Sequence, residues 1–133
     1  MTGAPALVSI LRQGAYLIAS VHTALDDSEM VRFQQDLVRQ IGETRARGVI
    51  IDVAALDVID SFGSRTLRTI AETARLRGAV TVIVGIQPDV AISMVTLGMG
   101  MGAVATALDL EEGLEYLARL RRAGHGRPRT GRS

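Results

Sequence analysis

The stretch VIIDVAALDVIDSFGSR, residues 49–65, decides the expected fold of this chain. Its first five residues are apolar except for Asp52, which is typical of a central strand that is covered on both faces of a sheet. Asp60 and Ser61 then occupy the cap or first-turn positions of a helix, where short polar side chains accept hydrogen bonds from free backbone N–H groups. The helix continues along an apolar stripe and ends at Gly78. The stripe consists of Leu67, Ile70, Ala71 and Ala74.

On the N-terminal side, two short β-rich runs flank a turn and precede another helix. Residues 7–11 and 16–21 surround residues 12–15, and this arrangement predicts a hairpin. Residues 26–28, Asp-Asp-Ser, offer a helix N-cap with acids that interact favourably with the helix dipole. An apolar stripe at helical spacing follows, and Gly48 ends the segment. The stripe consists of Met30, Phe33, Leu37 and Ile41.

On the C-terminal side, strands and helices continue to alternate. Residues 80–84 predict a second buried strand, and Pro88 begins a short helix that reaches about Leu97. Residues 103–105 predict a brief strand, and Asp109 is expected to cap a last helix. The inward face of that helix is expected to consist of Leu110, Leu114, Leu117 and Leu120.

The resulting element order is β-β-α-β-α-β-α-β-α. It predicts an α/β fold with a mostly parallel or mixed central sheet of about five strands and about four helices. We expect one domain over residues 1–121. The Gly, Pro and Arg content of residues 122–133 predicts a disordered tail, which is not expected to bind nucleic acid or a membrane because it has neither aromatic residues nor an amphipathic pattern.

Composition indicates a cytoplasmic globular protein. Of the 133 residues 47% are hydrophobic, enough for a real core, and the absence of cysteine suits a reducing compartment. The N-terminus has no basic segment followed by a long apolar run, so no signal peptide is expected. The longest apolar runs are far shorter than the roughly 18 residues that a membrane-spanning helix needs.

The charges are distributed unevenly along the chain. All fifteen basic residues are arginine, and six of them lie in the last fifteen residues, which contain no acid. The remaining residues therefore carry nine arginines against fourteen acids, a net charge of −5. The folded part is expected to be acidic and the tail basic.

The residues argue against an enzyme. Only His22 and His125 could serve as histidine bases, and the chain has too few of the residues that favour zinc. The glycines in residues 98–102 follow a helix rather than a strand, and no lysine is available to reach a phosphate, so a nucleotide loop is not indicated. Asp52 cannot act as the acceptor of a phospho-receiver domain, which also needs a lysine. We expect no catalytic residue, metal or cofactor.

The segment around Ser61 permits a switch. An Asp-Ser pair at a helix start is most simply a cap, worth about 1 kcal/mol. A hydroxyl exposed there can also carry a phosphate, which adds about −1.5 to −2 charges that the positive end of the helix dipole tolerates. Arg65, one turn further on, could pair with that phosphate. Local physics allows both interpretations.

Three stretches together resemble the STAS domain family of anti-sigma-factor antagonists. Residues 60–65 resemble the phosphoacceptor loop of that family, and residues 85–92 and 106–114 resemble its stressosome subgroup, the RsbS-type proteins. The resemblance covers about residues 5–121. Free antagonists of the family usually have a small residue and a glycine after the acceptor serine, whereas Phe62 stands there in this chain and favours the stressosome subgroup.

The resemblance implies a regulatory function without chemistry of its own. Proteins of this subgroup assemble with co-antagonist proteins that carry the same domain, so a homo- or hetero-oligomer is expected, and the assembly holds a serine kinase of the GHKL type. Phosphorylation of the acceptor, here Ser61 with Ser64 as a second candidate, releases the kinase, and a serine phosphatase resets the site. Asp60, Phe62 and Arg65 are then expected to contact the phosphate or the kinase.

Two alternatives stay open. The chain could be a free antagonist that binds an anti-sigma kinase directly in a one-to-one complex, or a STAS module that senses a nucleotide. Entry into very large particles would distinguish the stressosome role from the first alternative. Saturable nucleotide binding would indicate the second.

Overall fold

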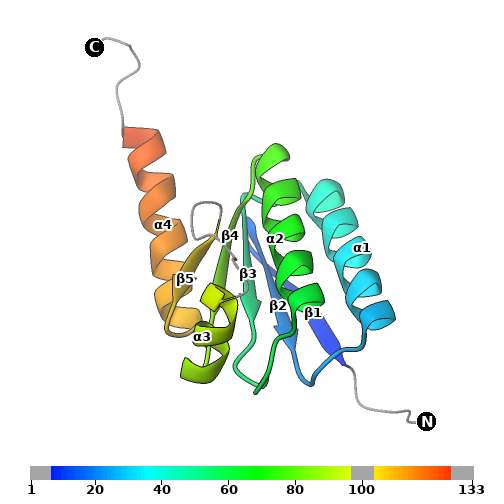
Figure 1. Ribbon diagram of the computed structural model, residues 1–133. Coiled ribbons are helices and arrows are strands. Elements are labelled where there is room, and N and C mark those ends of the chain that lie inside the picture. Colours follow the sequence, from blue (N-terminus) through cyan, green and yellow to red (C-terminus); the bar gives the residue numbers. More distant parts are fainter. Residues whose placement is uncertain (1–6, 97–103, 127–133) are drawn as a thin grey trace, which may run out of the picture.

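The computed structural model describes residues 7–96 and 104–126, which form a mixed five-stranded sheet with helices on both faces (Figure 1). The strands lie in the order β1-β2-β3-β4-β5; β1 is antiparallel to β2, and the remaining pairs are parallel. The predicted fold class is confirmed. The strands are β1 (Val8–Gln13), β2 (Tyr16–Val21), β3 (Gly48–Asp52), β4 (Val80–Val84) and β5 (Ala105–Ala107).

Two helices cover one face of the sheet and one helix covers part of the other. α1 (Asp27–Thr44) and α2 (Ser61–Leu76) lie side by side on one face, α4 (Leu110–Gly126) lies on the opposite face, and the short α3 (Pro88–Thr96) follows β4 (Figure 1). Burial of apolar surface between these layers is the main stabilising contribution. Within the described residues, no helix is both long and apolar enough to cross a membrane.

The predicted helical stripes are buried as expected. Met30, Phe33, Leu37 and Ile41 of α1 and Leu67, Ile70, Ala71 and Ala74 of α2 belong to the core between these helices and the sheet. Asp26 caps α1, since its carboxylate accepts the Glu29 N–H at 2.8 Å while the Glu29 side chain accepts the Asp26 N–H at 2.8 Å. This reciprocal pair satisfies two N–H groups that a helix start leaves free.

Two expectations for the last third of the chain were wrong. The short strand occupies Ala105–Ala107 rather than residues 103–105. In α4, Leu117 is buried and Leu114 packs against it, but Leu110 and Leu120 are 36% and 40% exposed. A 17-residue helix is about 25 Å long, whereas a five-residue strand spans about 16 Å, so both ends of α4 extend beyond the strands that they were expected to cover.

The boundary of the expected tail also changes. α4 continues to Gly126, so residues 122–126 are helical rather than part of a disordered tail. Residues 127–133 and the glycine- and methionine-rich residues 98–102 lie outside the described residues.

Candidate functional site

The loop that joins β3 to α2 leaves the central strand of the sheet and is fixed by neighbouring segments. The Val53 N–H donates to the Val84 carbonyl at 3.0 Å, and the Gln87 side-chain amide donates to the Ala54 carbonyl at 2.8 Å. Gly85, with φ +78°, lies against Ala54 so closely that a Cβ atom would be 2.8 Å from that alanine's Cβ. The loop before the Ser61 helix therefore has a defined path.

Asp60 is the N-cap of α2, and Ser61 is the first residue of the helix. The Asp60 backbone is extended, with φ −85° and ψ −179°, and its carboxylate accepts the Gly63 N–H at 2.7 Å. The Asp60 carbonyl accepts the Ser64 N–H at 2.9 Å. Asp60 thus does the capping, and Ser61 is solvent-exposed at the positive end of a 16-residue helix.

The two candidate serines lie in opposite environments. Ser64 is 3% exposed and faces the core, and its hydroxyl has no hydrogen-bond partner within the described residues. Phe62 is half-buried and packs against the same core. Of the hydroxyls in this loop, that of Ser61 is the accessible one.

Arg65 lies one turn after Ser61 and is exposed. It makes no ion pair with any residue that the structure describes, whereas the next arginine, Arg68, contacts Glu72 at 3.4 Å. Residues four apart share one side of a helix, so the Arg65 guanidinium can reach the side of α2 on which Ser61 lies.

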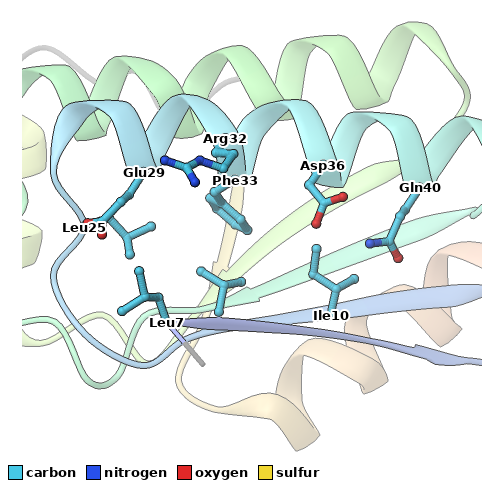
Figure 2. A pocket seen from close by; sticks show the side chains of 9 residues that line it. Leu7, Ile10, Leu25, Glu29, Arg32, Phe33, Asp36 and Gln40 are labelled. Atoms are coloured by element: carbon cyan, nitrogen blue, oxygen red, sulfur yellow. The ribbon is translucent and has the colours of Figure 1, made fainter. Parts of the chain in front are cut away.

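Two hollows lie near this end of the molecule. One of about 170 Å³ is apolar and has Asp60 and Gly63 at its edge, and the exposed Val58 also lines it. The other, of about 310 Å³, lies between β1 and α1; Figure 2 shows Leu7, Ile10 and Phe33 within it. The charged side chains along the second hollow come from α1, and no residue of the Ser61 loop is among its lining.

Asp52 and His22, the other residues weighed for a functional role, make contacts within the fold. The Asp52 carboxylate accepts the Ala54 N–H at 2.9 Å and so satisfies a nearby backbone group. His22 lies just after β2, and its ring nitrogen is 2.9 Å from the Ser9 hydroxyl. Sequence reasoning missed this Ser9–His22 contact, because it depends on the exact register of the hairpin. Among the described residues, no group of three or more His, Cys, Asp or Glu side chains could hold a metal.

Comparison with known proteins identifies relatives of this arrangement. The family model described as the STAS domain matches residues 8–109. The fold is similar to that of a serine-to-glutamate variant of RsbS from Moorella thermoacetica, with a TM-score of 0.80, 36% identity, and coverage of 88% of this chain and 99% of the other. A chain from a structure of the stressosome, a signal integration and transduction hub, has a TM-score of 0.73 and 33% identity and covers 86% of this chain and 99% of the other.

A curated relative is considerably longer. The RsbT co-antagonist protein RsbRA of Bacillus subtilis is 28% identical over 91 residues, which make up 68% of this chain. The present chain spans about a third of the length of RsbRA, since the match covers 33% of that protein.

Proposed function

The chain belongs to the STAS domain family, and on this premise we propose that it is a non-enzymatic stressosome scaffold and antagonist that sequesters a serine kinase and releases it when Ser61 is phosphorylated. It acts in a stress-response pathway that ends in a sigma factor. Its partners are a GHKL-type kinase, co-antagonist proteins with the same domain and a serine phosphatase. The similarity to RsbS, to a chain of the stressosome and to RsbRA supports the assembly.

The observation that carries the proposal is the exposure of Ser61 at the start of α2. A kinase needs a hydroxyl that can enter its active site, and Ser64, buried and facing the core, does not offer one. The similar Moorella structure is a serine-to-glutamate variant of RsbS. Such an exchange supplies part of the negative charge that a phosphate would add.

The mechanism of release is electrostatic. A phosphate on Ser61 adds about −1.5 to −2 charges at neutral pH. It lies next to the Asp60 carboxylate, which already accepts a helix N–H group, and close in sequence to the exposed Asp57. Arg65 supplies one positive charge on that side of the helix, so the phosphorylated surface stays strongly negative.

The size of this effect is sufficient for a switch. Burying an incompletely paired charge in an interface costs several kcal/mol, and about 1.4 kcal/mol corresponds to a tenfold change in affinity. A kinase surface that accepts the neutral serine is therefore expected to lose affinity by orders of magnitude after transfer of the phosphate.

The test is mass spectrometry of the full chain after incubation with the candidate GHKL-type kinase and ATP. We expect one phosphate on Ser61, its absence from Ser61→Ala, and its presence on the matched variant Ser64→Ala. In binding assays Ser61→Ala is expected to retain the kinase and Ser61→Asp to weaken it. Equal binding of both variants and wild type would contradict the switch.

The same preparations distinguish the alternatives. A one-to-one complex with the kinase, without entry into large particles when the co-antagonists are present, would indicate a free antagonist. Saturable nucleotide binding together with no phosphorylation would indicate a nucleotide-sensing module.

A further inference from the structure

The charged residues of the described chain are separated toward the two ends of the sheet. Because β2 to β5 are parallel and the helices between them run back, α1, α2 and α4 all finish at the end where the strands begin (Figure 1). We call this the arginine end. Its exposed basic residues include Arg45, Arg47, Arg75, Arg77, Arg121 and Arg122. The exposed Glu43 in the last turn of α1 also lies at this end, and it pairs with Arg39.

Contacts bring these arginines together from separate parts of the chain. Arg47 and Arg121 line one hollow of about 330 Å³ with Tyr16, and the Arg121 guanidinium lies 5.9 Å from the centre of the Tyr16 ring. The Arg77 guanidinium lies against Gly42 of α1, since a Cβ atom there would be 2.7 Å from it. None of the six arginines forms an ion pair with a residue that the structure describes.

The opposite end, where the parallel strands finish and the helices begin, carries the acids. We call it the acidic end. Arg32 of α1 and Arg65 of α2 are arginines that lie near this acidic end. Exposed acids of this end, in the helix starts and the Ser61 loop, are Asp26, Asp27, Asp57, Asp60, Asp89, Asp109, Glu111 and Glu112.

Helix dipoles explain only part of this separation. Acids at helix starts and bases at helix ends are stabilising, which accounts for Arg75 in the last turn of α2. The C-cap residues Arg45 of α1 and Arg77 of α2 are favoured in the same way, whereas Arg47 lies beyond α1 at the start of β3. Arg47 is therefore an arginine of this end that the helix ends do not explain.

We propose that the arginine end of one chain docks on the acidic end of a second copy of the same chain. The contact concerns the assembly part of the proposed function. Because Ser61 lies at the acidic end, a phosphate on it would add to the negative charge that the arginine end contacts. Charge complementarity selects this partner, because each copy presents both surfaces, and the net charge of +1 leaves little overall repulsion between copies. The two surfaces differ, so the contact is head-to-tail and can repeat into rings or chains.

The contact is electrostatic and therefore depends on salt. The Debye length falls from about 30 Å at about 0.01 M salt to about 3 Å at about 1 M. In sedimentation experiments on the full chain, the average mass is expected to rise with protein concentration at the low salt and to fall to that of one chain at the high salt.

Charge reversals locate the contact. Arg47→Glu/Arg122→Glu and Asp57→Arg/Glu111→Arg are each expected to weaken self-association at low salt by at least about tenfold. A matched single control compares Arg47→Glu with Arg68→Glu, which changes the same charge in the middle of α2 and is expected to leave association unchanged. Mixing the two double variants, of which one has lost its arginine end and the other its acidic end, is expected to restore association.

Several results would overturn the inference. These are a single-chain mass at low salt, association that survives high salt, or no recovery in the mixture although circular dichroism shows both variants folded. Binding of a nucleic-acid fragment by the arginine end in preference to a second copy would do the same. All variants keep Ser61, so failure here is distinguishable from failure of the phosphorylation test.

Discussion

Replacing Ser64 with alanine is expected to stabilise the protein and to leave the phosphorylation site intact. The Ser64 hydroxyl is buried, at 3% exposure, and has no partner within the described residues. By contrast, the Thr66 hydroxyl on the same helix donates to the Phe62 carbonyl at 2.8 Å. The substitution removes a polar group that has lost its water without gaining a hydrogen bond.

The magnitude follows from three contributions. An unsatisfied buried hydroxyl costs about 1–3 kcal/mol, and alanine is favoured over serine in a helix interior by about 0.5 kcal/mol. Against these stands the small cavity left by one oxygen atom, which costs a few tenths of a kcal/mol at about 24 cal/mol per Å³. The free energy of unfolding of Ser64→Ala is expected to exceed that of wild type by about 1–3 kcal/mol.

Urea unfolding followed by circular dichroism measures this difference, and kinase treatment of the same sample measures phosphorylation. We expect the free energy of unfolding to depend on urea concentration with an unchanged slope, and the midpoint of unfolding to lie at a higher urea concentration. A loss of stability of more than about 1 kcal/mol would show that the hydroxyl makes a hydrogen bond after all. A phosphate found on Ser64 in the Ser61→Ala variant would show that the helix start opens enough to expose it.

Three other substitutions test the packing and the capping. Gly42→Ala is expected to raise the free energy of unfolding by about 0.5–1 kcal/mol, because among the described residues the new Cβ would be close only to the flexible end of Arg77. Urea unfolding measures the change. Gly113→Ala is expected to lower it by about 1 kcal/mol, because the new Cβ would be 2.9 Å from Val84 Cγ1 in the sheet, and the same titration decides. The Glu29 N–H, and after it the Ser28 hydroxyl, hold the pKa of Asp26 below its usual value of 3.8. The wild-type advantage over Asp26→Asn is therefore present above that value and shrinks as the pH falls below it, which thermal melts across the acid range should show.

Much of the fold was predictable because local patterns and tertiary packing agree. The stripe from Met30 to Ile41 and the cap at Asp60 follow from spacing and short polar side chains, and both are present in the structure. α4 shows the limit of this reasoning. Four leucines share one apparent stripe, but a neighbouring glycine, Gly113, allows the helix to approach the sheet closely, and only Leu117 is fully buried. Which residues of an apolar stripe contact the sheet depends on the lengths of the strands beneath the helix. Those lengths cannot be predicted from the sequence of the helix itself.

The site was predictable in its position but not in its detail. The sequence placed both Ser61 and Ser64 in one loop, but Ser64 lies three residues before Leu67 and so extends the buried stripe, whereas Ser61 is the first residue of the helix. The distinction depends on where the helix begins, and Asp60 as the N-cap makes Ser61 its first residue. Phe62 likewise turns toward the core rather than outward, because its ring packs with the apolar cluster beneath α1 and α2.

The topology connects the phosphorylation site with the separation of charge. Parallel strands with returning helices bring every helix start to one end of the sheet, and helix starts favour acids and capping carboxylates. Ser61 lies at that acidic end, so a new phosphate joins Asp57 and Asp60 rather than the arginine cluster at the far end. Arg65 offsets only part of the added charge. The start of α2 therefore tolerates a phosphate on Ser61, but most of the phosphate's negative charge remains uncompensated and faces any partner that docks at this end.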